Sequence, residues 1–134
     1  MPISVVIAVD AMGGENSPAK IISGIEKYSK LNKDVFFRIF GVQKILENEI
    51  SKHNIQKDLY EIINCEEIVK DTDTPLSSAK KKNTSMWRAI DDVKQKRSNV
   101  IVSAGNTGAL FVISKLNLKM IENIDKPALS ALWP

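Results

Sequence analysis

The sequence contains 134 residues, of which 43% are hydrophobic and 26% are charged. These values are typical of one soluble globular domain and argue against disorder, collagen and a disulfide scaffold. The single cysteine, Cys65, excludes an intrachain disulfide and favours a reducing, cytoplasmic compartment. The net charge is +3, but only three of the 19 basic residues are arginine. Because nucleic-acid sites usually gather arginine and aromatic side chains, we expect no nucleic-acid partner.

Apolar runs alternate with stretches of helical periodicity in the first half of the chain. A strand is predicted at residues 3–9, and a helix after Ser17-Pro18, where a capping residue precedes a proline. A second strand, a helix and a third strand are predicted at residues 35–40, 42–52 and 59–64.

The second half of the chain begins with a polar segment. Residues 66–83 predict a long loop. A helix is then predicted from about residue 84, followed by a strand at 100–103, a helix at 107–121 and a strand at 128–133. The alternation as a whole predicts an α/β fold, with an open, mainly parallel sheet and helices on both faces.

The strand predicted at residues 128–133 has nothing after it to cover its far side. A complete α/β domain rarely ends on such a strand, because its edge is left open to association. We therefore expect residues 1–134 to be the N-terminal part of a single α/β domain whose C-terminal half is absent.

Two glycine-rich turns follow predicted strands. In the first, Asp10 ends the strand, and Gly13 and Gly14 allow the backbone to turn tightly and to expose its N–H groups before Asn16. Parallel sheets bind ligands at the carboxyl ends of their strands, where this turn lies. A plain strand-to-helix turn is the alternative interpretation, since the spacing matches neither a P-loop nor a dinucleotide-binding loop.

The second turn follows the strand at residues 100–103. Gly105 and Gly108 permit close backbone approach, and Asn106 and Thr107 add an amide and a hydroxyl group to the free N–H groups of a helix start. This combination predicts a site for phosphate or for the oxyanion of a reacting carbonyl. Two such turns at one edge of the sheet predict a ligand site more strongly than either turn does alone.

A basic segment precedes the helix predicted from residue 84. Lys80, Lys81 and Lys82 form a run that is usually a solvated surface, but here they precede a helix start at the ligand-binding edge. An anion at this place would meet both ammonium groups and helix N–H donors. Ser85 lies at that helix start. No residue pattern indicates a metal or an organic cofactor.

Four segments stand out in order: DAMGGENSP at residues 10–18, TSM at 84–86, VSAGNTGAL at 102–110 and IDKPAL at 124–129. Together they resemble the bacterial phosphate acyltransferases of the PlsX family, and the string from Ser103 to Leu110 is the most specific part. The resemblance covers essentially the whole chain but only the N-terminal part of the family, whose members are well over twice this length. Glu15 stands where the family usually has aspartate.

The resemblance implies a transferase that moves a fatty acyl group from acyl carrier protein to inorganic phosphate, giving an acyl phosphate for phospholipid synthesis. It further implies a fold similar to phosphotransacetylase and isopropylmalate dehydrogenase, a homodimer, and peripheral contact with the inner face of the membrane in some members.

For such a reaction we expect catalytic roles for Asp10, Lys82 and Asn106. The residues expected to bind phosphate or substrate are Gly13, Gly14, Asn16, Lys80, Ser85, Gly105, Thr107 and Gly108. Two alternatives remain open: an inactive truncated form or remnant of the enzyme, and a module similar to phosphotransacetylase that binds acyl-CoA and phosphate.

Overall fold

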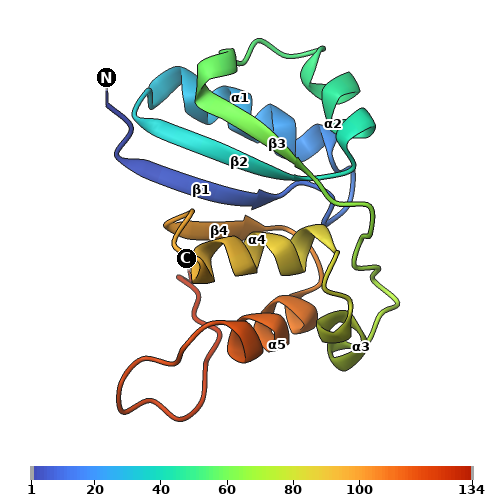
Figure 1. Cartoon of the computed structure of the whole chain (residues 1–134), viewed down its shortest axis with the longest axis vertical. Coiled ribbons are helices and arrows are strands. Elements are labelled where there is room, and N and C mark those ends of the chain that lie inside the picture. Colours follow the sequence, from blue (N-terminus) through green and yellow to red (C-terminus); the bar gives the residue numbers. More distant parts are fainter. Residues whose placement is uncertain (1, 134) are drawn as a thin grey trace.

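Four parallel strands form one sheet in the computed structural model, which describes residues 2–133 (Figure 1). The strands are β1 (Val5–Asp10), β2 (Val35–Gly41), β3 (Tyr60–Asn64) and β4 (Val100–Ser103). Their order across the sheet is β3-β2-β1-β4, and every neighbouring pair is parallel. The predicted α/β fold is therefore confirmed.

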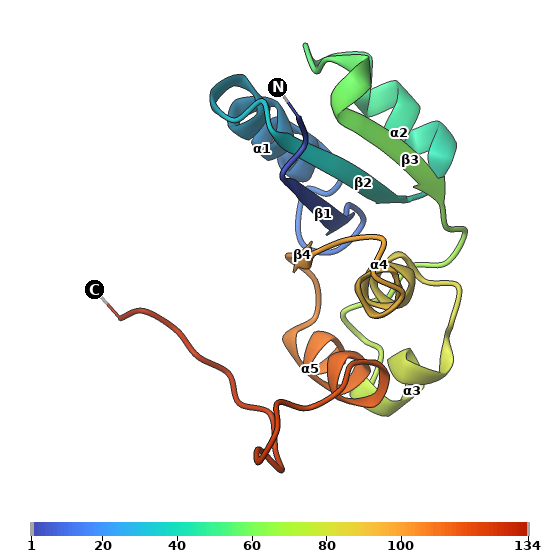
Figure 2. The same ribbon diagram turned by 60° about the vertical axis from the view of Figure 1, so that its left-hand side comes forward.

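Helices cover both faces of the sheet (Figures 1 and 2). On one face lie α1 (Ala19–Leu31) and α2 (Gln43–Ile50), and on the other lies α4 (Ser85–Lys94). Outside α4 pack α5 (Thr107–Asn117) and the short α3 (Pro75–Lys80), while a 3-10 turn, η1 (Lys57–Leu59), precedes β3. The return from β3 across β1 to β4 places the last strand beside the first, so the strand order reverses between β1 and β4.

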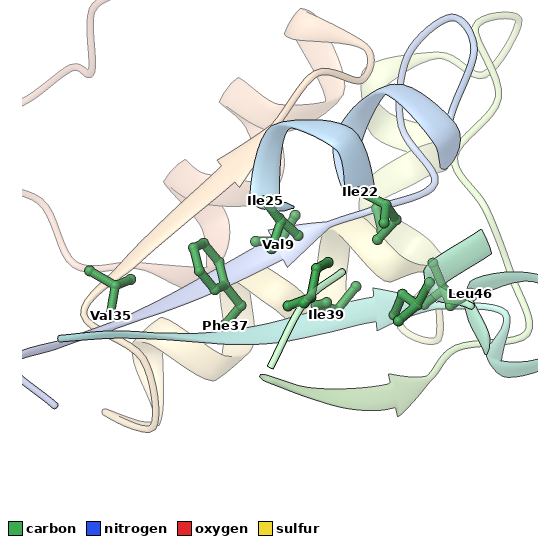
Figure 3. Packing of buried hydrophobic residues seen from close by; sticks show 10 residues of the cluster. Val9, Ile22, Ile25, Val35, Phe37, Ile39 and Leu46 are labelled. Atoms are coloured by element: carbon green, nitrogen blue, oxygen red, sulfur yellow. The ribbon is translucent and has the colours of Figure 1, made fainter. Parts of the chain in front are cut away.

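The larger core lies between the sheet and the pair α1 and α2. Alternate residues of β1 and β2 point to this face, as strand geometry requires, and they meet helix residues spaced three and four apart. Figure 3 shows this packing, which includes Val9, Val35, Phe37 and Ile39 from the strands and Ile22, Ile25 and Leu46 from the helices.

Helix α4 is held to the opposite face by small residues and by a buried acid. Ala8 on β1 and Ala89 on α4 are completely buried, so the helix backbone approaches the sheet closely. Asp92 accepts hydrogen bonds from Arg38 Nε on β2 at 2.9 Å and from Arg97 Nε at 2.8 Å, and also from Ser98. Burial alone would raise the pKa of Asp92, but these hydrogen bonds outweigh burial and lower it.

The polar segment at residues 66–83 is not entirely a loop, because it contains α3. Thr74 caps this helix by accepting a hydrogen bond from Ser77 N, and Pro75 occupies its first turn. Both are regular helix start signals. At six residues, α3 is too short to show a helical period in the sequence.

Three further boundaries differ from the predictions. Helix α1 begins at Ala19 after Pro18, and Ser17 does not cap it but donates its hydroxyl hydrogen bond to Gly13 O. Helix α5 ends at Asn117 instead of residue 121, because Leu118 turns to extended backbone and packs against the core. Residues 128–133 form no strand, since the structure provides no neighbouring strand for them; they lie apart from the sheet in Figure 2.

Among residues 2–133, no helix has both the length and the apolar character that crossing a bilayer requires.

His53 connects the two helices of the larger core. Its Nδ1 lies 2.6 Å from Glu26 Oε2 on α1, and its Nε2 lies 3.2 Å from Glu49 Oε1 on α2. The hydrogen bond to Glu26 is the main reason that the pKa of His53 is raised above 6.5, and Glu49 adds to it. Hydrogen bonds from Lys30 and His53 lower the pKa of Glu26 from 4.5 to about 2.

We predict that His53→Gln destabilises the chain in a pH-dependent way. Because folding raises the pKa of His53, its contribution is complete below pH 6.5 and is lost as the pH rises through the folded pKa. Glu26 contributes above pH 4.5 and loses its contribution as the pH falls towards 2. The loss of stability on His53→Gln, measured by urea unfolding, should therefore be largest at pH 4.5–6.5 and shrink at higher pH.

Lys27→Gln is the control, because Lys27 is exposed on α1 and itself forms no ion pair within the described residues. A difference between wild type and His53→Gln that is constant from pH 5 to pH 9 would contradict the prediction.

Candidate functional site

The candidate site lies at the carboxyl ends of β1 and β4, where the strand order reverses. Ligands of open α/β sheets bind at such a reversal, because the loops of neighbouring strands leave in opposite directions and open a crevice. The two loops that meet here are the two predicted glycine turns. One follows Asp10 at the end of β1, and the other follows Ser103 at the end of β4, which is paired with Asp10 across the sheet.

The two loops touch through their glycines. A Cβ atom on Gly13 would lie 2.9 Å from Gly105 Cα and 2.7 Å from Asp10 Oδ2, both closer than a side chain permits. Gly14 has a φ of +90°, and a Cβ atom there would lie 2.6 Å from Ala104 O. These positions therefore require glycine so that the loops can pack against each other.

The Asp10 carboxyl group, which is 1% exposed, is the polar centre beneath these loops. Its Oδ1 accepts a hydrogen bond from Ser85 Oγ at 2.6 Å, and its Oδ2 accepts one from Ser103 Oγ at 2.8 Å. Ser103 Oγ in turn accepts from Gly105 N at 3.1 Å. One side chain thus joins β1, β4 and the first residue of α4.

Two of these residues have roles that the sequence analysis did not give them. Ser103 was part of the quoted motif but not a proposed site residue; its register position opposite Asp10 is the signal that could have identified it. Ser85 is expected from the sequence to bind phosphate or substrate; in the structure its hydroxyl group is buried and donates its hydrogen bond to Asp10 Oδ1. Thr84 caps α4, accepting a hydrogen bond from Trp87 N at 3.1 Å.

Asn106 begins α5. Its Oδ1 accepts a hydrogen bond from Ala109 N at 3.1 Å, and its Nδ2 donates to Asp73 O at 3.3 Å. Thr107 and Gly108 form the first turn of α5, where backbone N–H groups have no acceptor within the helix. This end of α5 therefore presents N–H donors beside the Gly105 loop, an arrangement suited to an anion.

The basic segment divides into one structural and two free lysines. Lys81 Nζ lies 3.0 Å from both carboxylate oxygens of Asp73. The backbone hydrogen bond from Lys70 N, followed by the side-chain hydrogen bonds from Lys81 Nζ, lowers the pKa of Asp73. Lys80 and Lys82 are exposed, and within residues 2–133 neither forms an ion pair or a hydrogen bond to the glycine loops.

Asn16, the last predicted residue of the first loop, has a φ of 58° and holds the turn into α1. Its backbone carbonyl accepts a hydrogen bond from Lys20 N at 3.0 Å. The structure therefore brings together Asp10, Gly13, Ser85 and Gly105 directly. Asn106 follows Gly105 directly in the second loop and so lies next to this group.

Cys65 follows β3 at the same edge of the sheet but is not accessible. Burial raises the pKa of its thiol, although Arg88 Nη1 lies 3.7 Å from Sγ and opposes the increase. Arg88 Nη1 also donates to Asn64 O at 2.6 Å. A buried thiol of raised pKa is a packing residue and a poor nucleophile.

We predict that Ser85→Ala and Ser103→Ala each lower the free energy of unfolding by about 1–3 kcal/mol, because each removes a hydroxyl donor from the buried Asp10 carboxyl group; after Ser85→Ala, Oδ1 keeps only the longer hydrogen bond from Met12 N at 3.3 Å. The two changes share Asp10, so their effects should not add in a double-mutant cycle. Urea unfolding measures both quantities.

Ser51→Ala is the matched control, since the Ser51 hydroxyl bonds to Asn48 O on the surface of α2. Its effect should stay within about 0.5 kcal/mol. Ser85 and Ser103 variants as stable as the control would show that Asp10 does not hold the loops.

The sequence matches known proteins along almost its whole length. Residues 5–134 match the family described as "Fatty acid synthesis protein". A phosphate acyltransferase of Pelagibacter ubique is 60% identical over 129 residues, which cover 96% of this chain and 38% of the relative. Phosphate acyltransferases of Neorickettsia sennetsu and Rhodopseudomonas palustris are 40% and 38% identical, and the chain covers 39% and 38% of them. The chain thus spans little more than a third of the length of these curated relatives.

Proposed function

The chain belongs to the fatty acid synthesis protein family, and we propose that it carries the phosphate-binding part of a phosphate acyltransferase. The proposed donor is acyl carrier protein loaded with a fatty acyl group, the acceptor is inorganic phosphate, and the product is an acyl phosphate for phospholipid synthesis. The names of the relatives support the acyltransferase class. The donor and the product are part of the proposal.

The observation that carries the proposal is the contact of the two glycine loops at the start of α5. This contact puts the Gly105 loop and the first N–H groups of α5 at the crevice where the strand order reverses. Backbone donors in such a place bind a phosphate or an oxyanion without reorganising, which is what an acyl transfer to phosphate needs.

The proposed reaction asks for little covalent chemistry from the protein. An oxygen of hydrogen phosphate attacks the thioester carbonyl carbon, a C–O bond forms, and negative charge collects on the carbonyl oxygen. The C–S bond then breaks with its electron pair going to sulfur, and the proton of hydrogen phosphate goes to the released thiolate. The protein's task is to orient two anionic partners and to stabilise the oxyanion.

We assign the anion contacts to the loop before α5 and to its first turn. Thr107 and Gly108 offer backbone N–H groups, Gly105 lets an anion approach the backbone closely, and the Asn106 amide lies at the same helix end. The free cations Lys80 and Lys82 raise the local concentration of phosphate and of an acidic carrier protein. Lys81 has no such role, because Asp73 holds it.

Asp10 acts in this proposal as a positioning residue. Both of its carboxyl oxygens accept hydrogen bonds from serine hydroxyl groups, and through Ser103 it fixes the Gly105 N–H group. The turns at Gly14 and Asn16, both of positive φ, hold the first loop against the second.

The test uses a chimera in which this chain replaces the matched segment of the Pelagibacter ubique relative. With acyl carrier protein as donor and labelled phosphate, the chimera should form acyl phosphate as the intact relative does. A chimera that melts like the relative but forms no acyl phosphate would overturn the proposal. Turnover with acyl-CoA alone would reassign the donor.

We predict that Asn106→Asp in this chimera raises the KM for phosphate at least about tenfold, equivalent to about 1.4 kcal/mol. Aspartate caps a helix as well as asparagine does, so α5 keeps its start; the 3.3 Å hydrogen bond to Asp73 O is lost, and a negative charge is placed beside the incoming anion. Steady-state kinetics with varied phosphate measures the change, and thermal melting verifies that the stability is kept.

Gln56→Glu is the matched control, because it adds the same charge at an exposed position before β3, at the amino end of the sheet. Its KM for phosphate should equal that of the parent chimera. Equal phosphate kinetics for Asn106→Asp and Gln56→Glu would remove the start of α5 from the phosphate site.

A further inference from the structure

The side-chain amide of Asn106 is held in one orientation by contacts at both of its ends. Its Oδ1 accepts the hydrogen bond from Ala109 N at 3.1 Å, and its Nδ2 donates one to the backbone carbonyl of Asp73 at 3.3 Å. Turning the amide over would set two donors against each other at Ala109 N and two acceptors against each other at Asp73 O. Within residues 2–133, Nδ2 contacts no further acceptor, so the second of its two N–H hydrogens is free to bind a ligand.

The backbone of Asp73 is itself fixed through its carboxylate group. Its Oδ2 accepts a hydrogen bond from Lys70 N at 2.9 Å, and both of its carboxylate oxygens lie 3.0 Å from Lys81 Nζ. Lys81 directly follows α3, so the ion pair spans that short helix and ties its two ends together. The side chain of Asp73 is 15% exposed, which reduces the screening of the ion pair by water and salt.

The same segment packs on the first turn of α5, and Figure 2 shows α3 beside α5. Pro75, the first residue of α3, lies against Gly108, because a Cβ atom on Gly108 would be 3.1 Å from Pro75 Cγ. Residues 73–75 therefore reach the start of α5 twice, through the hydrogen bond to Asn106 and through this packing contact. A shift of the segment would move the acceptor that orients the Asn106 amide.

We propose that the ion pair between Asp73 and Lys81 positions the Asn106 amide, so that its second N–H hydrogen serves the anion at the start of α5. This inference rests on the proposed function, in which that anion is phosphate. Asp73 and Lys81 touch no substrate. They act through the Asp73 carbonyl group, which selects the orientation of the amide, and they are therefore positioning residues.

The sign of the effect on phosphate binding separates positioning from simple electrostatics. Asp73→Asn removes a negative charge near the anion but keeps an oxygen for Lys70 N. By Coulomb's law alone, this change would lower the KM for phosphate. Positioning predicts the opposite, because Lys81 no longer holds the segment and the Asn106 amide turns between two orientations. A variant that was only less stable would have fewer active molecules, which lowers kcat and leaves KM unchanged.

Steady-state kinetics of the chimera with varied phosphate tests the proposal. Asp73→Asn and Lys81→Met should each raise the KM for phosphate at least about fivefold and change kcat by less than about twofold. Both changes break the same ion pair, so the double variant should resemble either single variant. Lys81→Arg keeps the charge opposite Asp73 and should hold the KM within about twofold of the parent value.

Each charge change has a matched control at an exposed residue that forms no ion pair within the described part of the chain. Asp71→Asn removes the same charge as Asp73→Asn two residues earlier, and its KM for phosphate should be equal to or below that of the parent chimera. Lys33→Met removes a lysine charge before β2, at the amino end of the sheet, and should leave the KM unchanged.

Amide hydrogen exchange in the 134-residue chain gives a second measurement that does not use catalysis. When the Asn106 amide turns over, Ala109 N loses its acceptor, so Asp73→Asn should speed exchange of the Ala109 N–H at least about fivefold. The N–H of Gln43 is the internal control, because it is also held at a helix start by an asparagine, Asn64 Oδ1, at 3.0 Å. Its exchange should not change.

Three results would overturn the proposal: a KM for Asp73→Asn equal to or below that of Asp71→Asn, a Lys81→Arg variant as impaired as Lys81→Met, or Ala109 exchange that Asp73→Asn leaves unchanged. The exchange measurement separates this proposal from the proposed function. A parent chimera that forms no acyl phosphate would count against the function, whereas Ala109 exchange would still decide whether the ion pair holds the amide.

Discussion

The arrangement of the candidate site depends on the buried carboxyl group of Asp10. A polar group in this position is strongly destabilising unless its hydrogen bonds are made, and here two serine hydroxyl groups and the Met12 N–H group make them. Because Ser85 begins α4 and Ser103 ends β4, satisfying Asp10 fixes both elements against β1. The Gly105 N–H group is then held by Ser103, so the loop that leads into α5 inherits its position from the same carboxyl group.

The glycines of the two loops satisfy a second, steric constraint. It follows from the position of β4 beside β1, which Asp10 fixes. Once β1 and β4 are adjacent, the loops that leave them must share the space above Asp10, and only backbone without side chains fits there. The close approach of Gly13 to Gly105 is therefore a packing requirement. The absence of side chains there also leaves backbone N–H groups uncovered at the sheet edge. The same glycines that permit the packing therefore create the capacity to bind an anion.

Much of this fold could be predicted from local sequence, whereas the site could be predicted only in part. Buried parallel strands appear as continuous apolar runs, so the four strands lay close to their predicted positions. Helix α3 was missed because six residues show no period, and residues 128–133 were wrongly predicted because an apolar run forms a strand only beside a neighbour. The glycine turns were visible in the sequence. The role of Ser103 was not, since it depends on the register between β1 and β4, which local patterns do not contain.

Strand β4 contributes to two different surfaces of the molecule, because its alternate residues point to opposite faces of the sheet. Ser103 faces Asp10 and supports the Gly105 loop, while Val102, one residue earlier, lines an apolar groove between α1 and the sheet. The strand has four residues and, within residues 2–133, is paired along one edge only, so its own hydrogen bonds restrain it weakly. Covering Val102 and pairing the free edge would restrain Ser103 as well, since both belong to the same short backbone segment. Because Ser103 Oγ accepts from Gly105 N, a better restrained Ser103 would also hold the loop that we assign to phosphate, and a preorganised site needs such restraint.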